Sequence, residues 1–151
     1  MKKLHYDATI AAPRALVWDT MLAPDTYQQW TAEFMPGSYY EGSWDEGSRI
    51  RFLAPDGTGM ISVIATNRPH EFVSIKHLGE IKNGVEDTES DAVRAWAPAF
   101  ENYTLSDAGS GTRVDVDMDV AGGEFEEFMA QTWPRALARL KALCESRSKQ
   151  A

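Results

Sequence analysis

The stretch GTRVDVDMDVAGGEFEEFMAQTWPRALARLKALC, residues 111–144, decides the fold of this chain. Over residues 113–120, charged residues alternate strictly with valine or methionine, which is typical of a strand with one face in the core and one in water. Gly122 and Gly123 follow, and apolar residues then recur at the i, i+3, i+4 and i+7 spacing of an amphipathic helix. The segment therefore predicts a strand followed directly by a helix over about residues 124–146, roughly 35 Å long at ~1.5 Å per residue.

Pro134 lies inside this predicted helix. Because proline has no backbone N–H and its ring crowds the preceding turn, it should remove one hydrogen bond and kink the helix. The apolar stripe keeps its phase on both sides of Pro134, so we expect one bent helix rather than two. A helix with such a broad apolar face needs a concave sheet to cover it.

The residues before this stretch read as strands and turns, with two short helices near the start. One helix begins at Pro13 and ends before Pro24, and the second, over residues 25–30, can be capped by Asp25. The polar segment 82–94 contains Asn83-Gly84 and is either a long loop or a hairpin excursion. Six strands are predicted, over residues 3–11, 49–53, 60–66, 72–78, 99–105 and 112–120.

Consecutive strands joined by short turns favour an antiparallel meander, and a sheet of this length must twist and curl. The predicted fold class is α+β, of the helix-grip kind. A curved six-stranded antiparallel sheet, with two short helices after the first strand, wraps around a long kinked C-terminal helix. We expect a single domain over residues 1–148 and a disordered tail at 149–151.

Charge and cysteine content exclude several classes of partner and compartment. The net charge is −8, with 23 acidic against 15 basic residues, which disfavours nucleic acids and anionic membranes as partners. Cys144 is the single cysteine, so no internal disulfide can form, as is usual in a reducing compartment. No signal peptide and no run of roughly 18 apolar residues is present. We therefore expect a cytoplasmic protein.

Scattered motifs over nearly the whole chain resemble the START-related helix-grip superfamily, also called SRPBCC. Within it, the chain resembles the group named for the activator of the ninety-kilodalton heat-shock protein's ATPase. The resemblance implies an apolar cavity between sheet and C-terminal helix. The chain departs from the group at residues 45–48, where two glycines are usual, and in its longer acidic loop at 82–94. The matching motifs are residues 11–13 with 17–18, residues 25–30, Asp56-Gly57 with Gly59, and residues 69–71, 103–105, 111–114 and 133–140.

Glu101 is the most informative candidate for a site. If Tyr103 and Leu105 face inward, the period of two residues along a strand places Glu101 on the same face. A carboxyl group inside an apolar pocket is expected to have a raised pKa and could serve as acid, base or ligand anchor. The alternative is a solvated position at the strand end. Arg51 is a possible partner of Glu101 if the phase of its own strand is reversed.

His77 has two open interpretations: a polar group directed into the cavity, or an exposed strand end. Asp115, Asp117 and Asp119 have the spacing of a calcium loop, but Val120 stands where such a loop needs glycine. We therefore predict no metal, and no cofactor motif is present either. Cys144 belongs to the apolar stripe of the helix and is expected to be a buried hydrophobe.

The leading hypothesis is a binding protein for a small, largely apolar molecule held between the sheet and the C-terminal helix. One alternative is a cyclase or hydrolase of aromatic or polyketide-like substrates, with Glu101 or His77 as acid or base. Another is an interaction module resembling a chaperone cofactor. Because no catalytic motif is present, we lean against an enzyme, and both monomer and dimer stay open. The predicted pocket lining is Trp30, Phe52, His77, Glu101, Tyr103, Met118, Phe128 and Trp133.

Overall fold

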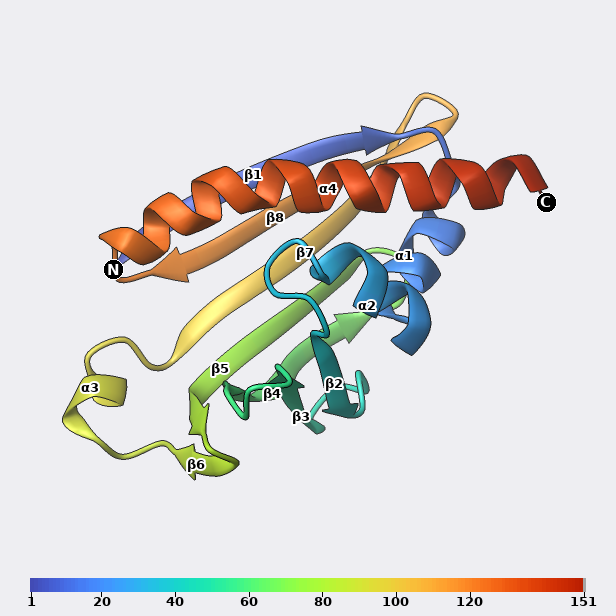
Figure 1. The fold of residues 1–151 in the computed structure, drawn as a ribbon. Coiled ribbons are helices and arrows are strands. Elements are labelled where there is room, and N and C mark those ends of the chain that lie inside the picture. The colour runs from blue at the N-terminus through green and yellow to red at the C-terminus, as the bar shows by residue number, and fades with distance from the viewer. Residues whose placement is uncertain (151) are drawn as a thin grey trace.

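The computed structural model describes residues 1–150. It contains one sheet, with helices α1, α2 and α4 over the same face (Figure 1). The elements in chain order are β1 (Lys2–Ile10), α1 (Arg14–Leu22), α2 (Pro24–Thr31), β2 (Tyr39–Gly42), β3 (Arg49–Leu53), β4 (Gly59–Arg68), β5 (Phe72–Lys82), β6 (Val85–Asp87), α3 (Asp91–Arg94), β7 (Ala99–Ala108), β8 (Gly111–Val120) and α4 (Glu124–Gln150).

The strands are ordered β1-β8-β7-β5-β4-β3-β2, and every neighbouring pair is antiparallel. The first strand therefore pairs with the last, and the remaining strands follow as a meander. The predicted α+β class is confirmed, as are the antiparallel sheet, the two short helices after the first strand and the long C-terminal helix. Figure 1 shows the sheet twisting beneath α4.

The described residues form eight strands, two more than the six predicted. The four residues of β2 pair with β3 at the sheet edge. The other addition, β6, returns along β5 after a turn at Asn83 and Gly84, which have φ of 50° and 76°. Positive φ at both central residues is typical of a tight hairpin turn. Of the two alternatives for residues 82–94, the hairpin excursion is therefore the one present, followed by α3.

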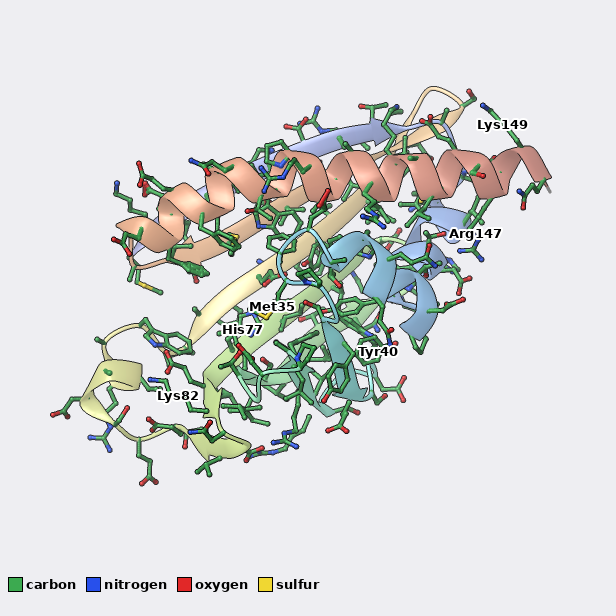
Figure 2. The ribbon with its side chains drawn as sticks, in the orientation of Figure 1. Met35, Tyr40, His77, Lys82, Arg147 and Lys149 are labelled. Carbon is green, nitrogen blue, oxygen red and sulfur yellow. The ribbon has the colours of Figure 1, made fainter. Side chains whose placement is uncertain are left out.

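Helix α4 is one continuous helix of 27 residues in which Pro134 faces solvent (Figure 1). It extends beyond the predicted end at residue 146 and ends at Gln150. Residue 151 lies outside the described residues. Tertiary contact explains the extra turn, because Arg147, labelled in Figure 2, lies in it. Its guanidinium donates a hydrogen bond to the Thr20 hydroxyl of α1 at 2.5 Å. No helix among the described residues has the length and apolar character that crossing a membrane requires.

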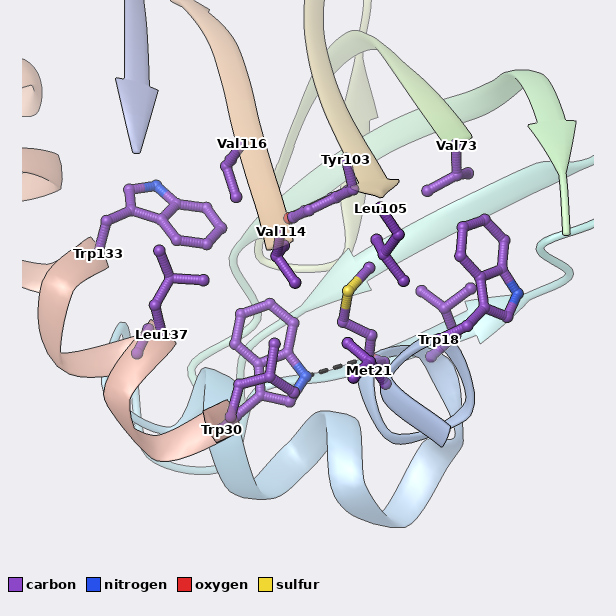
Figure 3. Close-up of a cluster of buried hydrophobic side chains, with 14 of the residues drawn as sticks. Trp18, Met21, Trp30, Val73, Tyr103, Leu105, Val114, Val116, Trp133 and Leu137 are labelled. Atoms are coloured by element: carbon purple, nitrogen blue, oxygen red, sulfur yellow. Dashed lines mark hydrogen bonds between the residues drawn. The ribbon is translucent and has the colours of Figure 1, made fainter. Parts of the chain in front are cut away.

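The main core lies where α1, α2 and α4 meet β7 and β8 (Figure 3). Val114 and Val116 of β8 are fully buried, so the predicted alternation along this strand is confirmed. Trp30 of α2 packs against Trp133 of α4 with ring centroids 6.0 Å apart, and its indole N–H donates to the Met21 carbonyl at 3.1 Å. The second half of α4 contributes Leu137, Leu140 and Cys144 to this core.

Candidate functional site

A cavity of about 640 Å³ lies between the sheet and helices α2 and α4. Ligand pockets typically measure about 300–1,000 Å³. Cavities of this size are uncommon in closely packed protein interiors. Aromatic side chains form much of the wall, and residues from the sheet form its floor. The lining includes Tyr27, Trp30, Phe34, Trp44, Phe52, Ile75, His77, Glu101, Tyr103, Met118, Phe125, Met129 and Trp133.

Seven of the eight predicted lining residues meet at this cavity. They come from six different elements, which sequence reasoning brought together only through the expected fold. The seven are Trp30, Phe52, His77, Glu101, Tyr103, Met118 and Trp133.

Phe128 is the exception, because it lies outside the cavity and is 44% exposed. Successive residues on a helix are rotated by about 100°, so Phe128 faces away from the buried line of Met129 and Trp133. Its ring instead packs against that of Phe34, with the ring centroids 6.4 Å apart. Phe125, four residues before Met129 and on the same face, lines the cavity in its place.

A buried polar chain runs from the sheet into the cavity. His77 of β5 lies directly opposite Ser62 of β4, and its Nδ1 is 2.7 Å from the Ser62 hydroxyl oxygen. Its Nε2 is 3.0 Å from Oε1 of Glu101 on β7, and the Tyr103 hydroxyl donates to Oε2 of the same carboxylate. Because an ionised carboxylate only accepts hydrogen bonds, Nε2 carries the proton toward Glu101. Nδ1 of His77 and the Ser62 hydroxyl form the second hydrogen bond of the ring.

The pKa of Glu101 is lowered, contrary to the raised value expected from its place in an apolar pocket. Burial alone would raise this pKa, but the hydrogen bond and charge of His77, together with the hydrogen bond from Tyr103, outweigh it. The sequence-based expectation was wrong because it assumed a carboxyl without donors. Glu101 is therefore an ionised acceptor at neutral pH, whereas burial and the charge of Glu101 raise the pKa of Tyr103 and keep it protonated.

Arg51 is not the partner of Glu101. Ile50 is fully buried and Phe52 lines the cavity, so the alternation along β3 turns Arg51 to the opposite face. There its guanidinium lies 3.3 Å from a carboxylate oxygen of Glu86 and 3.5 Å from one of Glu41.

Sequence reasoning missed several residues of the site, among them Tyr27 and Ser62. Tyr27 lies three residues before Trp30 on a predicted helix, so helical spacing could have placed both on one face. Ser62 carries no local signal, because a register shift between Ile61 and Ser62 buries both side chains in succession.

Aromatic contacts join the lining residues into a closed circuit. The ring of Tyr27 is 5.9 Å from that of Trp30 and 6.3 Å from that of Phe52. Phe52 contacts the His77 ring at 5.9 Å, which leads through Glu101 to Tyr103. The circuit then closes from Tyr103 to Trp133 at 6.1 Å and from Trp133 to Trp30 at 6.0 Å. Such a wall accepts flat apolar groups along most of its perimeter and offers an ionised group at Glu101.

Ser62, His77 and Glu101 are the residue types of a hydrolase triad, but here the serine hydroxyl has no access to the cavity. Ser62 is fully buried within the sheet and does not line the cavity, so its hydroxyl is not placed to attack a bound molecule. Glu101 and His77 do reach the cavity and are the groups that could exchange a proton with its contents.

One cluster of potential metal ligands lies outside the cavity. His5 of β1, Asp7 and Asp115 hold their ligand atoms within 4.8 Å of one another. Arg113 already pairs with both carboxylates, at 3.3 Å from Asp7 and 3.0 Å from Asp115. These side chains belong to the outer, charged face of the sheet.

Comparison with solved structures shows the same fold in several bacterial proteins. Protein MLL2253 from Mesorhizobium loti has a TM-score of 0.73 at 14% identity, over 96% of this chain and 98% of that chain. The Aha1 dimer from Colwellia psychrerythraea has a TM-score of 0.71 at 17% identity, over 96% and 97%. ChR145 from Cytophaga hutchinsonii has a TM-score of 0.70 at 19% identity, over 97% and 96%. At these identities the likeness concerns the fold alone.

No curated protein matches the chain. The family described as "Activator of Hsp90 ATPase homolog 1-like protein" does match, over residues 11–145. This match covers most of the chain and confirms the resemblance found in the sequence motifs. The chain belongs to the Activator of Hsp90 ATPase homolog 1-like family, within the SRPBCC superfamily.

Proposed function

We propose that this protein binds a small, largely apolar molecule in the cavity between its sheet and α4. The observation that carries the proposal is a cavity of about 640 Å³ whose wall is a closed circuit of mainly aromatic side chains. Aromatic walls bury a large apolar area of a ligand and constrain its orientation. The single charged group in the circuit, Glu101, supplies a fixed polar contact of the kind that orients ligands in apolar pockets.

Native mass spectrometry of gently purified protein tests the proposal. We expect a non-covalent adduct that disappears on denaturation and whose mass identifies the ligand. After the protein is stripped, the neutral fluorescent probe N-phenylnaphthylamine should bind and should be displaced by the recovered ligand. Absence of both the adduct and probe binding would contradict the proposal.

A matched pair of variants locates the binding to the cavity. Ile75 of β5 lines the cavity and is 2% exposed, so Ile75→Phe fills part of it. Leu78 lies on the opposite face of the same strand, outside the cavity, so Leu78→Phe adds the same bulk elsewhere. We expect Ile75→Phe to weaken probe binding at least about tenfold and Leu78→Phe to leave it unchanged. Thermal unfolding of both variants controls for loss of the fold.

The contact between His77 and Glu101 favours a second candidate, acid–base catalysis on an apolar substrate. In this case the carboxylate of Glu101 accepts a proton, and His77 stabilises the charged form before the transfer. The two functions differ in what happens to a bound molecule. Incubation of the recovered ligand with protein, followed by mass spectrometry of the small molecule, yields an unchanged mass for a binding protein and a product for an enzyme.

A further inference from the structure

The hydroxyl of Tyr27 is an accessible polar group of the cavity wall without a partner among residues 1–150. Two polar groups on neighbouring aromatic rings are occupied. Trp30 donates to the Met21 carbonyl at 3.1 Å, and the Tyr40 hydroxyl donates to the Leu22 carbonyl at 2.5 Å. Nε1 of Trp44 and Nε1 of Trp133 also lack partners, but the surrounding atoms enclose both, and the Tyr27 hydroxyl is not enclosed in this way.

Tyr27 and Glu101 belong to the same stretch of the wall. The Tyr27 ring is 6.3 Å from Phe52, which is 5.9 Å from His77, which in turn contacts Glu101. Burial and then the charge of Glu101 raise the pKa of Tyr27, so its hydroxyl keeps its proton at neutral pH. Tyr27 is therefore a hydrogen-bond donor without an acceptor in the same cavity as an ionised carboxylate.

Glu101 keeps spare capacity as an acceptor. Its Oε1 receives the hydrogen bond from His77 and its Oε2 the one from Tyr103, while the two oxygens together offer about four lone-pair positions. The side chain is 18% exposed, so part of the carboxylate is open to the cavity. A ligand group that donates to Glu101 and accepts from Tyr27 would satisfy both residues.

A hydroxyl group has this combination, with one hydrogen to donate and lone pairs to accept. A ketone has no donor for Glu101, a carboxylate would meet the charge of Glu101 in an apolar setting, and an ammonium group would lose its hydration there at a cost that pairing with Glu101 does not repay. We propose that the cavity selects neutral hydroxylated molecules, an apolar skeleton bearing a phenol or alcohol that bridges Glu101 and Tyr27. This selectivity rests on the proposed binding function.

Four naphthalene derivatives test the selectivity, because they share one skeleton and differ in a single group. Their affinities are measured at neutral pH by displacement of N-phenylnaphthylamine from the stripped protein. We expect 2-naphthol to bind at least about tenfold more tightly than naphthalene, 2-naphthoate or 2-naphthylmethylammonium, as one hydrogen bond to a charged group provides. Equal affinities, or tighter binding of the ammonium or the carboxylate, would overturn the selectivity while leaving the binding function intact. Binding of neither the probe nor any of the four would contradict the binding function itself.

Three variants assign the preference to the two residues. Tyr27→Phe and Glu101→Gln should each lower the affinity for 2-naphthol about five- to tenfold and leave that for naphthalene unchanged, which also shows that the cavity is intact. Glu101→Gln should in addition strengthen the binding of 2-naphthoate. Tyr40→Phe is the matched control, because Tyr40 is not among the lining residues and its hydroxyl is bound to the Leu22 carbonyl. Loss of 2-naphthol binding in Tyr40→Phe as large as in Tyr27→Phe would argue against the bridge.

Discussion

Two histidine–carboxylate clusters lie on opposite faces of the sheet, with nearly the same contact distances. On the outer face, Nδ1 of His5 is 2.8 Å from an Asp117 carboxylate oxygen. In the cavity, Nε2 of His77 is 3.0 Å from a Glu101 carboxylate oxygen. The difference lies in their access to water, since the His5 side chain is 46% exposed and that of His77 only 9%.

The exposure of each cluster to water determines how much its ion pairs contribute to stability. Exposed ion pairs are screened and give little net stabilisation, so the outer cluster is most simply a soluble sheet face. A buried pair is sensitive to the loss of either partner, because the remaining charge has no replacement for its hydrogen bonds. Similar distances therefore do not imply similar roles, and the inner pair is the one placed to recognise a ligand.

The largest expected difference between the clusters is in stability. Replacement of His77 by Leu removes a donor from the Glu101 carboxylate and leaves the Ser62 hydroxyl without its partner, both inside the protein. We expect a loss of about 3 kcal/mol in the free energy of unfolding. The matched change His5→Leu should cost less than about 1 kcal/mol. Urea denaturation of the two variants at neutral pH measures both values, and equal losses would show that burial does not separate the clusters.

An intermediate effect is expected from Glu101→Gln, and it depends on pH. The pKa of Glu101 is lowered in the folded protein from an ordinary value of 4.5, so the ionised form is preferentially stabilised by folding. Its contribution is present above the unfolded pKa and is lost as pH falls through the lowered folded pKa. Relative to the variant, the wild-type protein should be more stable by about 1 kcal/mol at neutral pH. This advantage should shrink in acid, and an advantage that grows with acidity would contradict the direction of the shift.

The features that could be predicted from the sequence are those with a local pattern of residues. Alternation in residues 113–120 and helical spacing after residue 124 predicted the last strand and α4, since both patterns are local. The two-residue period of a strand predicted that Glu101 and Tyr103 share one face of β7, and both line the cavity. Local patterns also placed Phe128 in the pocket, which was wrong because one helical step of about 100° turns it outward.

Contacts between distant strands could not be predicted in the same way. Glu101 meets His77 only because the excursion through β6 and α3 returns the chain beside β5, and the lowered pKa of Glu101 follows from that meeting. Ser62 joins the chain of polar groups through a register shift that no alternation pattern reveals. The sequence thus predicted the cavity and seven of its lining residues, while the polar network within it required the pairing of the strands.

The smallest expected effect belongs to the outer cluster and has the opposite dependence on pH. The hydrogen bond to Asp117, ahead of the surrounding carboxylates, raises the pKa of His5 above its ordinary value of 6.5. The stabilisation is therefore complete below the unfolded pKa and is lost as pH rises through the folded one. Relative to His5→Gln, the wild-type protein should gain a few tenths of a kcal/mol at pH below about 6 and nothing in alkaline solution.

High salt should affect the stability advantages given by His5 and Glu101 differently. At about 1 M salt the Debye length is roughly 3 Å, so the advantage conferred by the exposed His5 should largely disappear in urea denaturation at pH below about 6. The advantage of Glu101 over Gln at neutral pH should survive the same salt, because buried pairs are screened much less. If both advantages vanished together, the cavity would be as well solvated as the outer face. Glu101 could then no longer act as the desolvated acceptor that the proposed ligand preference needs.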